Sequence, residues 1–262
     1  MKKFVLLLSA AALLMTACEP EKIEPHNGNE GPSAPAQTYP ATAVVIHNAV
    51  TDIDGNVYDA VKIGNQVWMA SNLRTTRYAN GEPIPEGGED SSLSSPYRYK
   101  QGDNFDIYGY LYNWPAVMHG ASSSNDNPSG VQGICPNGWH MPSDSEWTQL
   151  TDYCSSQSEC VCDGSDINIA KSLASDHDWK PGDFDCAVGN DMSLNNVTGF
   201  SAVPAGCYTD AYYALGNGTY FWSSTVDCPT KSVYRNIMYA LPKVSRGCGS
   251  RASGMSVRCV RN

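Results

Sequence analysis

Basic residues are scarce in this sequence. It contains 17 lysine and arginine residues against 27 aspartate and glutamate residues, and its formal net charge is −10 at pH 7. The basic residues form no stripe along the chain, and no nucleic-acid-binding motif is present. An acidic surface repels both the phosphate backbone of nucleic acids and anionic lipid headgroups. We therefore expect no nucleic-acid partner.

Histidines and long apolar segments are also few. The five histidines are scattered along the chain. Cys160 and Cys162 are separated by one residue, whereas cysteine pairs that bind zinc are usually separated by about two to four. A zinc site is therefore not expected. The apolar run at residues 4–14 is too short to span a membrane.

The N-terminus has the pattern of an export signal. Lys2 and Lys3 precede the apolar run, and Leu14-Met15-Thr16-Ala17-Cys18 resembles the lipobox of bacterial lipoproteins. The resemblance implies a signal peptide at residues 1–17, cleavage before Cys18, and palmitate and other acyl chains on Cys18 that anchor the protein in the outer membrane. An ordinary secretory signal with an incidental cysteine is the alternative. Cleavage leaves 15 basic and 27 acidic residues, a net charge of −12.

Residues 18–40 are rich in Pro, Glu, Gly, Asn and Ser and poor in large apolar residues. Such a composition buries too little surface to fold, so we expect a flexible tether. The acidic residues after Cys18 loosely resemble the surface-export signals of Bacteroidetes lipoproteins, which favours the cell surface. Residues 41–262 are then predicted to form a single domain.

The segment at residues 133–150 gives the strongest structural signal. Pro136-Asn137-Gly138 is typical of a turn. Ser143 and Glu146 have the spacing of a capping box, and Trp147, Leu150 and Cys154 follow at helical spacing, which predicts a helix over residues 143–154. His140 could be a ligand or a base, but no carboxylate, serine or cysteine stands at a spacing that suggests a catalytic dyad, so we interpret this histidine as structural.

The rest of the domain indicates short strands joined by long loops. Extended runs at residues 57–63 and 66–70 flank Gly64-Asn65 and predict a hairpin. Further strands are expected at residues 108–114, 198–206, 220–225, 233–241 and 254–261, and a short helix is expected within residues 163–173. The aromatic run at 108–114 suits core packing, with a sugar-binding surface as the alternative. Together these elements predict an α+β fold with an antiparallel sheet.

Two acidic segments could hold calcium. Asp52-Ile53-Asp54-Gly55-Asn56 resembles the start of a calcium loop but lacks the downstream glutamate of an EF-hand, and Asp-Gly is also an ordinary turn. Residues 176–191 contain five aspartates, of which Asp183 and Asp185 are the weak calcium candidates. A solvated acidic loop is the alternative there. We therefore expect no cofactor, with calcium as the open exception.

Several motifs together resemble the Fibrobacter succinogenes major paralogous domain, which occurs in lipoproteins of the Bacteroidetes and Fibrobacteres. They are residues 54–58, 63–73 (Ile-Gly-Asn-Gln-Val-Trp-Met-Ala-Ser-Asn-Leu), 108–114 (Tyr-Gly-Tyr-Leu-Tyr-Asn-Trp), 133–150, 199–206, 221–225 (Phe-Trp-Ser-Ser-Thr) and 256–260 (Ser-Val-Arg-Cys-Val). The resemblance covers residues 51–262. The sequence departs from the family pattern in its many cysteines and in Cys207, which stands where an aromatic residue is expected.

The resemblance implies a C-type-lectin-like fold: a twisted antiparallel sheet with one or two helices and long loops. Nine cysteines remain beside Cys18, an odd number whose connectivity does not follow from the sequence: Cys135, Cys154, Cys160, Cys162, Cys186, Cys207, Cys228, Cys248 and Cys259. The resemblance suggests that Cys135 is bonded to Cys259. It implies no reaction.

The function that these features favour is a surface-anchored binding or adhesion module. Its ligand, a glycan or a surface protein, would contact loops on a rigid scaffold. The first candidate loop is residues 207–219, with Tyr208, Tyr212 and Tyr213, because tyrosine gives a large contact area at low entropic cost. The second is residues 227–253.

Two other functions are weighed against the binding module. One is a structural subunit of a cell-surface fibre or a polysaccharide-handling complex. The other is an enzyme similar to formylglycine-generating enzymes, which need a pair of closely spaced reactive cysteines. Cys248 and Cys259 are the available residues, but they are far apart for that chemistry, and an enzyme is not expected.

Overall fold

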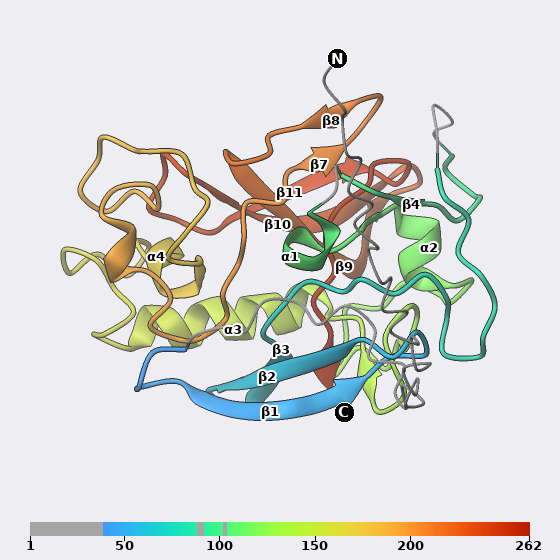
Figure 1. Ribbon diagram of the computed structural model, residues 1–262, viewed down its shortest axis with the longest axis horizontal. Helices are drawn as coiled ribbons and strands as arrows, with labels where there is room; N and C mark the ends of the chain where they lie inside the picture. The colour runs from blue at the N-terminus through green and yellow to red at the C-terminus, as the bar shows by residue number, and fades with distance from the viewer. Residues whose placement is uncertain (1–38, 88–91, 102–103) are drawn as a thin grey trace, which may run out of the picture. The chain divides into compact units, whose positions relative to one another are not determined.

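The computed structural model describes residues 39–87, 92–101 and 104–262 (Figure 1). The predicted signal peptide, Cys18 and the predicted tether as far as residue 38 lie outside the described residues. The described part consists mostly of antiparallel strands with a few short helices, which confirms the α+β class.

The largest sheet has five strands in the order β1-β2-β3-β12-β6. The predicted hairpin around Gly64-Asn65 is confirmed, because Ile63 pairs with Gln66 across the turn. The C-terminal strand β12 lies between β3 and β6, so the two ends of the domain share one sheet. Figure 1 shows the C-terminus close to β1 and β2. The bounds are β1 Val44–Thr51, β2 Val57–Ile63, β3 Gln66–Met69, β6 Trp139–His140 and β12 Val260–Arg261.

A second sheet and two short strand pairs carry the remaining strands. The second sheet has the order β11-β10-β9, with β9 Gly218–Cys228, β10 Lys231–Met238 and β11 Ser245–Ser250. The short pairs are β4 Arg98–Tyr99 with β5 Leu111–Tyr112, and β7 Cys207–Tyr208 with β8 Tyr212–Tyr213. The strand expected at residues 220–225 lies within β9, and that expected at 233–241 largely coincides with β10.

The long helix α3, Asp144–Ser156, begins where the sequence predicts. Ser143 Oγ accepts from the Glu146 backbone N–H at 3.1 Å, and Glu146 Oε2 accepts from the Ser143 N–H at 3.0 Å. This capping box satisfies two donors at the helix start. The buried face carries Trp147, Leu150 and Cys154. The other helices are short: α1 Phe105–Tyr108, α2 Trp114–Met118, α4 Ala170–Leu173 and the 3₁₀ turn Met192–Leu194.

Four expected elements are shorter than the sequence suggests. The strand expected at residues 254–261 is present only as β12, preceded by isolated bridges at Gly254, Met255 and Ser256. The helix expected within residues 163–173 is present only as α4, because Asp163 and Gly164 adopt φ values of +53° and +78°, which a right-handed helix excludes. The run at 198–206 forms two isolated bridges, Ala202 with Ala174 and Gly206 with Thr219, rather than a strand. The run at 108–114 divides into α1, β5 and α2.

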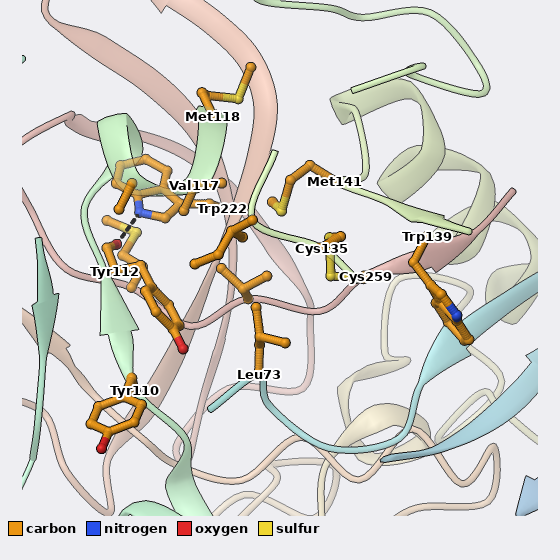
Figure 2. Close-up of a cluster of buried hydrophobic side chains, with 14 of the residues drawn as sticks. Leu73, Tyr110, Tyr112, Val117, Met118, Cys135, Trp139, Met141, Trp222 and Cys259 are labelled. Atoms are coloured by element: carbon orange, nitrogen blue, oxygen red, sulfur yellow. Dashed lines mark hydrogen bonds between the residues drawn. A yellow bond between two sulfur atoms is a disulfide. The ribbon is translucent and has the colours of Figure 1, made fainter. Parts of the chain in front are cut away.

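The aromatic run at 108–114 lies in the core. Tyr110, Tyr112 and Trp114 are all buried. The Trp222 indole donates to the Tyr112 carbonyl at 2.8 Å (Figure 2), and the Trp114 indole donates to the Ser223 carbonyl at 3.0 Å. These two bonds join the run to β9, so its aromatic side chains serve packing rather than a sugar-binding surface.

Arg258 is a charged group at the centre of the fold, with 0% of its surface exposed. Its guanidinium donates to the Asn72 side-chain oxygen at 2.7 Å and to the backbone carbonyls of Met69, Phe200 and Ser201. It also lies 4.6 Å from the centre of the Phe200 ring. Burial lowers the pKa of Arg258 to about 9, and the four acceptors hold it in the charged form at neutral pH.

Candidate functional site

The predicted tyrosine loop forms a two-stranded hairpin, β7–β8. Cys207 pairs with Tyr213, and Tyr208 pairs with Tyr212. The hairpin starts at Gly206, whose φ of +68° and close contact with the Tyr213 carbonyl (an added Cβ would lie 2.3 Å from that oxygen) leave no room for a side chain. A loop expected from the sequence is therefore a defined turn with a fixed register.

Tyr208 is not a surface residue, which corrects the expectation that it contacts a ligand. It is 5% exposed, and its ring stacks on Tyr99 with the ring centres 4.0 Å apart. Its N–H and carbonyl both bond to Gly254, each at 2.8 Å. An added Cβ on Gly254 would lie 2.6 Å from the Tyr99 ring. Tyr208 therefore fixes the hairpin to the domain.

Tyr212 and Tyr213 project from this fixed base. They are 45% and 66% exposed, and Leu215 beside them is 47% exposed. The Tyr212 ring meets the Tyr208 ring edge-on at 5.1 Å, so its position is restrained. Partial burial, with the neighbouring Tyr208 and the charge of Glu86, raises the pKa of Tyr212. The Tyr212 ring therefore offers a neutral hydroxyl and an apolar face at neutral pH.

The surroundings of the hairpin are aromatic and acidic. Tyr97 and Tyr108 pack against the buried group formed by Tyr99, Leu111, Ala205 and Tyr208. The pKa of Tyr108 is raised to about 12 by burial and by its hydrogen bond to Asp178. Cys207 is buried on the first strand of the hairpin, and burial raises the pKa of its thiol to about 11. This thiol therefore remains protonated and unreactive at neutral pH.

The expectation that residues 227–253 form a second candidate loop is wrong. Most of it forms β10 and β11 of the three-stranded sheet. Arg235 on β10 forms an ion pair with Asp144 at 2.7 Å, which joins this sheet to the start of α3. The polar and glycine-rich composition of β11 hides its strand character in the sequence, because only the pairing with β10 supplies it.

A polar hollow of about 750 Å³ lies beside the end of α2 and was not expected from the sequence. His119 lies on its wall, stacked on the buried ring of Tyr78 at 3.6 Å and bonded to Glu82 at 3.0 Å. The hydrogen bond from His119 lowers the pKa of Glu82. Serine, asparagine and glutamine residues supply half of the remaining wall, including Asn80, Ser122, Ser123, Gln132 and Asn137.

His140 is buried and bonded to a carboxylate, Glu146, a partner that the spacing in the sequence does not suggest. It is 3% exposed, and its two ring nitrogens bond to Glu146 and to Asn262, each at 2.7 Å. Glu146, 2% exposed, also accepts from the backbone N–H groups of Ser129 and Ser143. Burial alone would lower the pKa of His140, but the hydrogen bond and charge of Glu146 raise it overall.

The calcium-like segment at residues 52–56 has its carboxylates engaged by protein donors. Asp52 accepts from the backbone of Asp54 and Asn56 and from the Tyr58 hydroxyl. Asp54 accepts from Thr75, Thr76 and Arg77, and despite burial these bonds lower its pKa. The segment is therefore an Asx-type turn that joins β1 to β2.

Asp183 and Asp185 are both exposed and flank Phe184, which is 73% exposed. Within residues 39–87, 92–101 and 104–262, no group of three or more His, Cys, Asp or Glu side chains is arranged to hold a metal ion. In the same part of the chain, none of the helices is long and apolar enough to cross a membrane.

Two disulfides are present among the described residues. Cys135 is bonded to Cys259 with a Cα–Cα distance of 6.0 Å, the pairing that the family resemblance implies, and Cys162 is bonded to Cys186. The first bond lies in the core beside Met141 and Leu73 (Figure 2). Because Cys259 is bonded, it has no thiol to act with Cys248 in formylglycine-type chemistry.

Comparison with known proteins identifies the scaffold. The family model described as the Fibrobacter succinogenes major domain matches residues 61–261. The chain belongs to the Fibrobacter succinogenes major domain family. No curated protein and no solved structure matches the chain.

The motifs that suggested the Fibrobacter succinogenes major domain are mainly structural. Asn72 bonds to the buried Arg258, and Asn113 caps α2 by accepting from the Ala116 N–H. Trp222 bonds to the 108–114 run. Tyr212 and Tyr213 on β8 lie outside those motifs, so in this family member the exposed aromatic groups are separate from the residues that build the scaffold.

Proposed function

We propose that this protein is an outer-membrane lipoprotein, exposed at the cell surface, whose domain is a binding module. Cys18 carries the lipid and residues 18–40 form the tether. The hairpin β7–β8 is the centre of the binding surface. We also assign the domain to the C-type-lectin-like folds, a proposal supported by the pairing of β12 with β3 and by the long connections between short strands.

The observation that carries the proposal is the contrast within one hairpin. Tyr208 is buried and stacked, whereas Tyr212 and Tyr213, four and five residues later, are 45% and 66% exposed. Exposed aromatic groups on a rigid base lose little side-chain freedom on binding, which favours their use in recognition.

We propose a surface protein rather than a glycan as the ligand. Leu215 extends the exposed apolar surface beside the two tyrosines, and tyrosine with an aliphatic neighbour is typical of the centre of a protein–protein interface. The carboxylate oxygens of Asp52 and Asp54 already accept hydrogen bonds from protein donors. A sugar bound through calcium is therefore not supported at that segment.

The binding test places a photo-crosslinking phenylalanine analogue at single positions in cells of the source bacterium. We expect the analogue at Tyr213 to give a discrete adduct with another protein. The matched control position is Ile53, which is 45% exposed in the turn between β1 and β2 and should give none. Equal adducts from both positions, or binding to glycans that persists in a Tyr212→Ser/Tyr213→Ser variant, would contradict the assignment.

The anchor has a separate test, so that the two parts of the proposal can fail independently. Cells fed labelled palmitate should incorporate it into the wild-type chain but not into a Cys18→Ser variant. Protease added to intact cells should degrade the wild-type domain if it faces outward. Label in the Cys18→Ser variant, or full protection from protease, would contradict the anchor or the surface exposure respectively.

A further inference from the structure

The end of α3 holds two thiols in direct contact. Cys154 lies in the last turn of the helix, and Cys160 follows after two successive turns closed by the bonds Gln157 N–H to Cys154 O and Cys160 N–H to Gln157 O. Both side chains are buried in the same cluster, at 0% and 6% exposed. Their thiols hydrogen-bond to each other, and both interact with the Ser172 hydroxyl.

Other cysteines of the domain, including one close to this pair in the sequence, are already oxidised to disulfides. Cys162, two residues after Cys160, is bonded to Cys186, and Cys135 is bonded to Cys259. A chain with two such bonds folds where disulfides persist. In an oxidising environment two thiols that contact each other are readily oxidised to a disulfide, because the fold already holds the second sulfur beside the first.

We propose that Cys154 and Cys160 form a third disulfide, which closes the loop 155–159 and fixes the end of α3. The oxidant is a disulfide of a small molecule or an oxidoreductase. The Cys160 thiolate attacks one sulfur of that disulfide and releases a thiolate. Deprotonated Cys154 then attacks Cys160 Sγ in the mixed disulfide and releases the second thiolate. Two thiol protons go to solvent, and the two electrons reduce the oxidant.

The electrostatics of the pair agree with this order of attack. The hydrogen bond from the Cys154 thiol, aided by Ser172, lowers the pKa of Cys160 in spite of its burial. The pKa of Cys154 is raised, first by the same hydrogen bond and then by burial. Cys160 is also the more exposed of the two, so it is the thiol that meets the oxidant.

The bond would leave three thiols in the described residues, and they differ from the pair. Cys207 is buried in the hairpin, while Cys228 and Cys248 lie on strands β9 and β11, separated by β10. Within the described residues, none of the three is disulfide-bonded. The odd count of nine cysteines is then explained by three disulfides and three separate thiols.

The test is mass spectrometry of the full chain isolated from an exported fraction, alkylated in denaturant without reduction. Cleavage after glutamate and lysine separates Cys154 from Cys160, because Glu159 lies between them and Lys171 follows. We expect the 147–159 peptide to be joined to the 160–171 peptide, and reduction to raise the number of alkylated thiols among the described residues from three to nine.

A Cys162→Ala/Cys186→Ala variant resolves which cysteine is joined, because its 160–171 peptide retains only Cys160. The link to 147–159 should persist there, and it should disappear in Cys154→Ala, which should expose Cys160 to alkylation. Free, alkylated Cys154 and Cys160 in the wild-type protein, or a link from Cys154 to Cys162 or Cys186, would overturn the proposal. The wild-type measurement decides even if a variant fails to fold.

Discussion

Replacement of Arg258 by methionine should be among the most damaging single changes in this domain. Methionine fills a similar volume but donates no hydrogen bonds, so the Asn72 side chain and the carbonyls of Met69, Phe200 and Ser201 lose their donor. Four bonds to a charged group, at about 1.5–3 kcal/mol each, would together exceed about 6 kcal/mol. Removal of the buried charge returns several kcal/mol of desolvation energy.

We therefore expect Arg258→Met to lower the free energy of unfolding by about 4 kcal/mol. The matched control is Arg261→Met, three residues later on the exposed side of β12, where the guanidinium lies 5.3 Å from the Trp139 ring. That contact contributes at most about 1 kcal/mol.

The assay is urea unfolding followed by tryptophan fluorescence. With a slope of about 2–3 kcal/mol/M for a domain of this size, the midpoint of Arg258→Met should fall by roughly 1.5–2 M and that of Arg261→Met by less than about 0.5 M. Unchanged slopes would show that stability rather than compactness is altered. If both variants unfold at the same urea concentration, the carbonyl cage around Arg258 does not hold the fold together.

Three further changes test other parts of the structure. The pKa of His140 is raised in the folded state, so its stabilising contribution is complete below the unfolded pKa of about 6.5 and is lost as the pH rises through the folded pKa. The urea midpoint should therefore decrease as the pH is raised from about 5.5 to about 8.5. Glu146→Gln should flatten that dependence. Gly254→Ala, which drives a methyl group into the Tyr99 ring, should cost about 1–3 kcal/mol and accelerate proteolysis at the β7–β8 hairpin; a protease-resistant hairpin would argue against this anchor. Cys135→Ala/Cys259→Ala should cost about 4–5 kcal/mol because the bond closes a 124-residue separation; calorimetry showing the wild-type melting temperature would contradict this.

Sequence reasoning succeeds in this chain where the signal is local. The capping box at Ser143 and Glu146 and the two-residue turn at Gly64-Asn65 each depend on a few neighbouring residues, and the structure contains both. It fails where long-range contacts decide. Tyr208 and Tyr213 have the same side chain on the same hairpin, and only the packing of Tyr99 and Gly254 makes one buried and the other exposed.

The same distinction explains the other differences. The glycine-rich strand β11 exists through its pairing with β10, and its sequence resembles a loop. The polar hollow is walled by segments near Asn80, Ser122 and Gln132, none of which carries a binding motif of its own. A short helix is expected within residues 163–173, but the left-handed conformations of Asp163 and Gly164 exclude a right-handed helix at the start of that range.

The position of β12 has a consequence for how the protein is made. Arg258 lies 189 residues after Met69, whose carbonyl it binds, and β12 completes the sheet beside β3. At synthesis rates of about 5–20 residues per second, β3 waits roughly 10 to 40 s for this partner. During that interval its edge is unpaired and open to pairing with another chain. The nascent domain therefore depends on being kept unfolded, or shielded, until nearly all of it has left the ribosome.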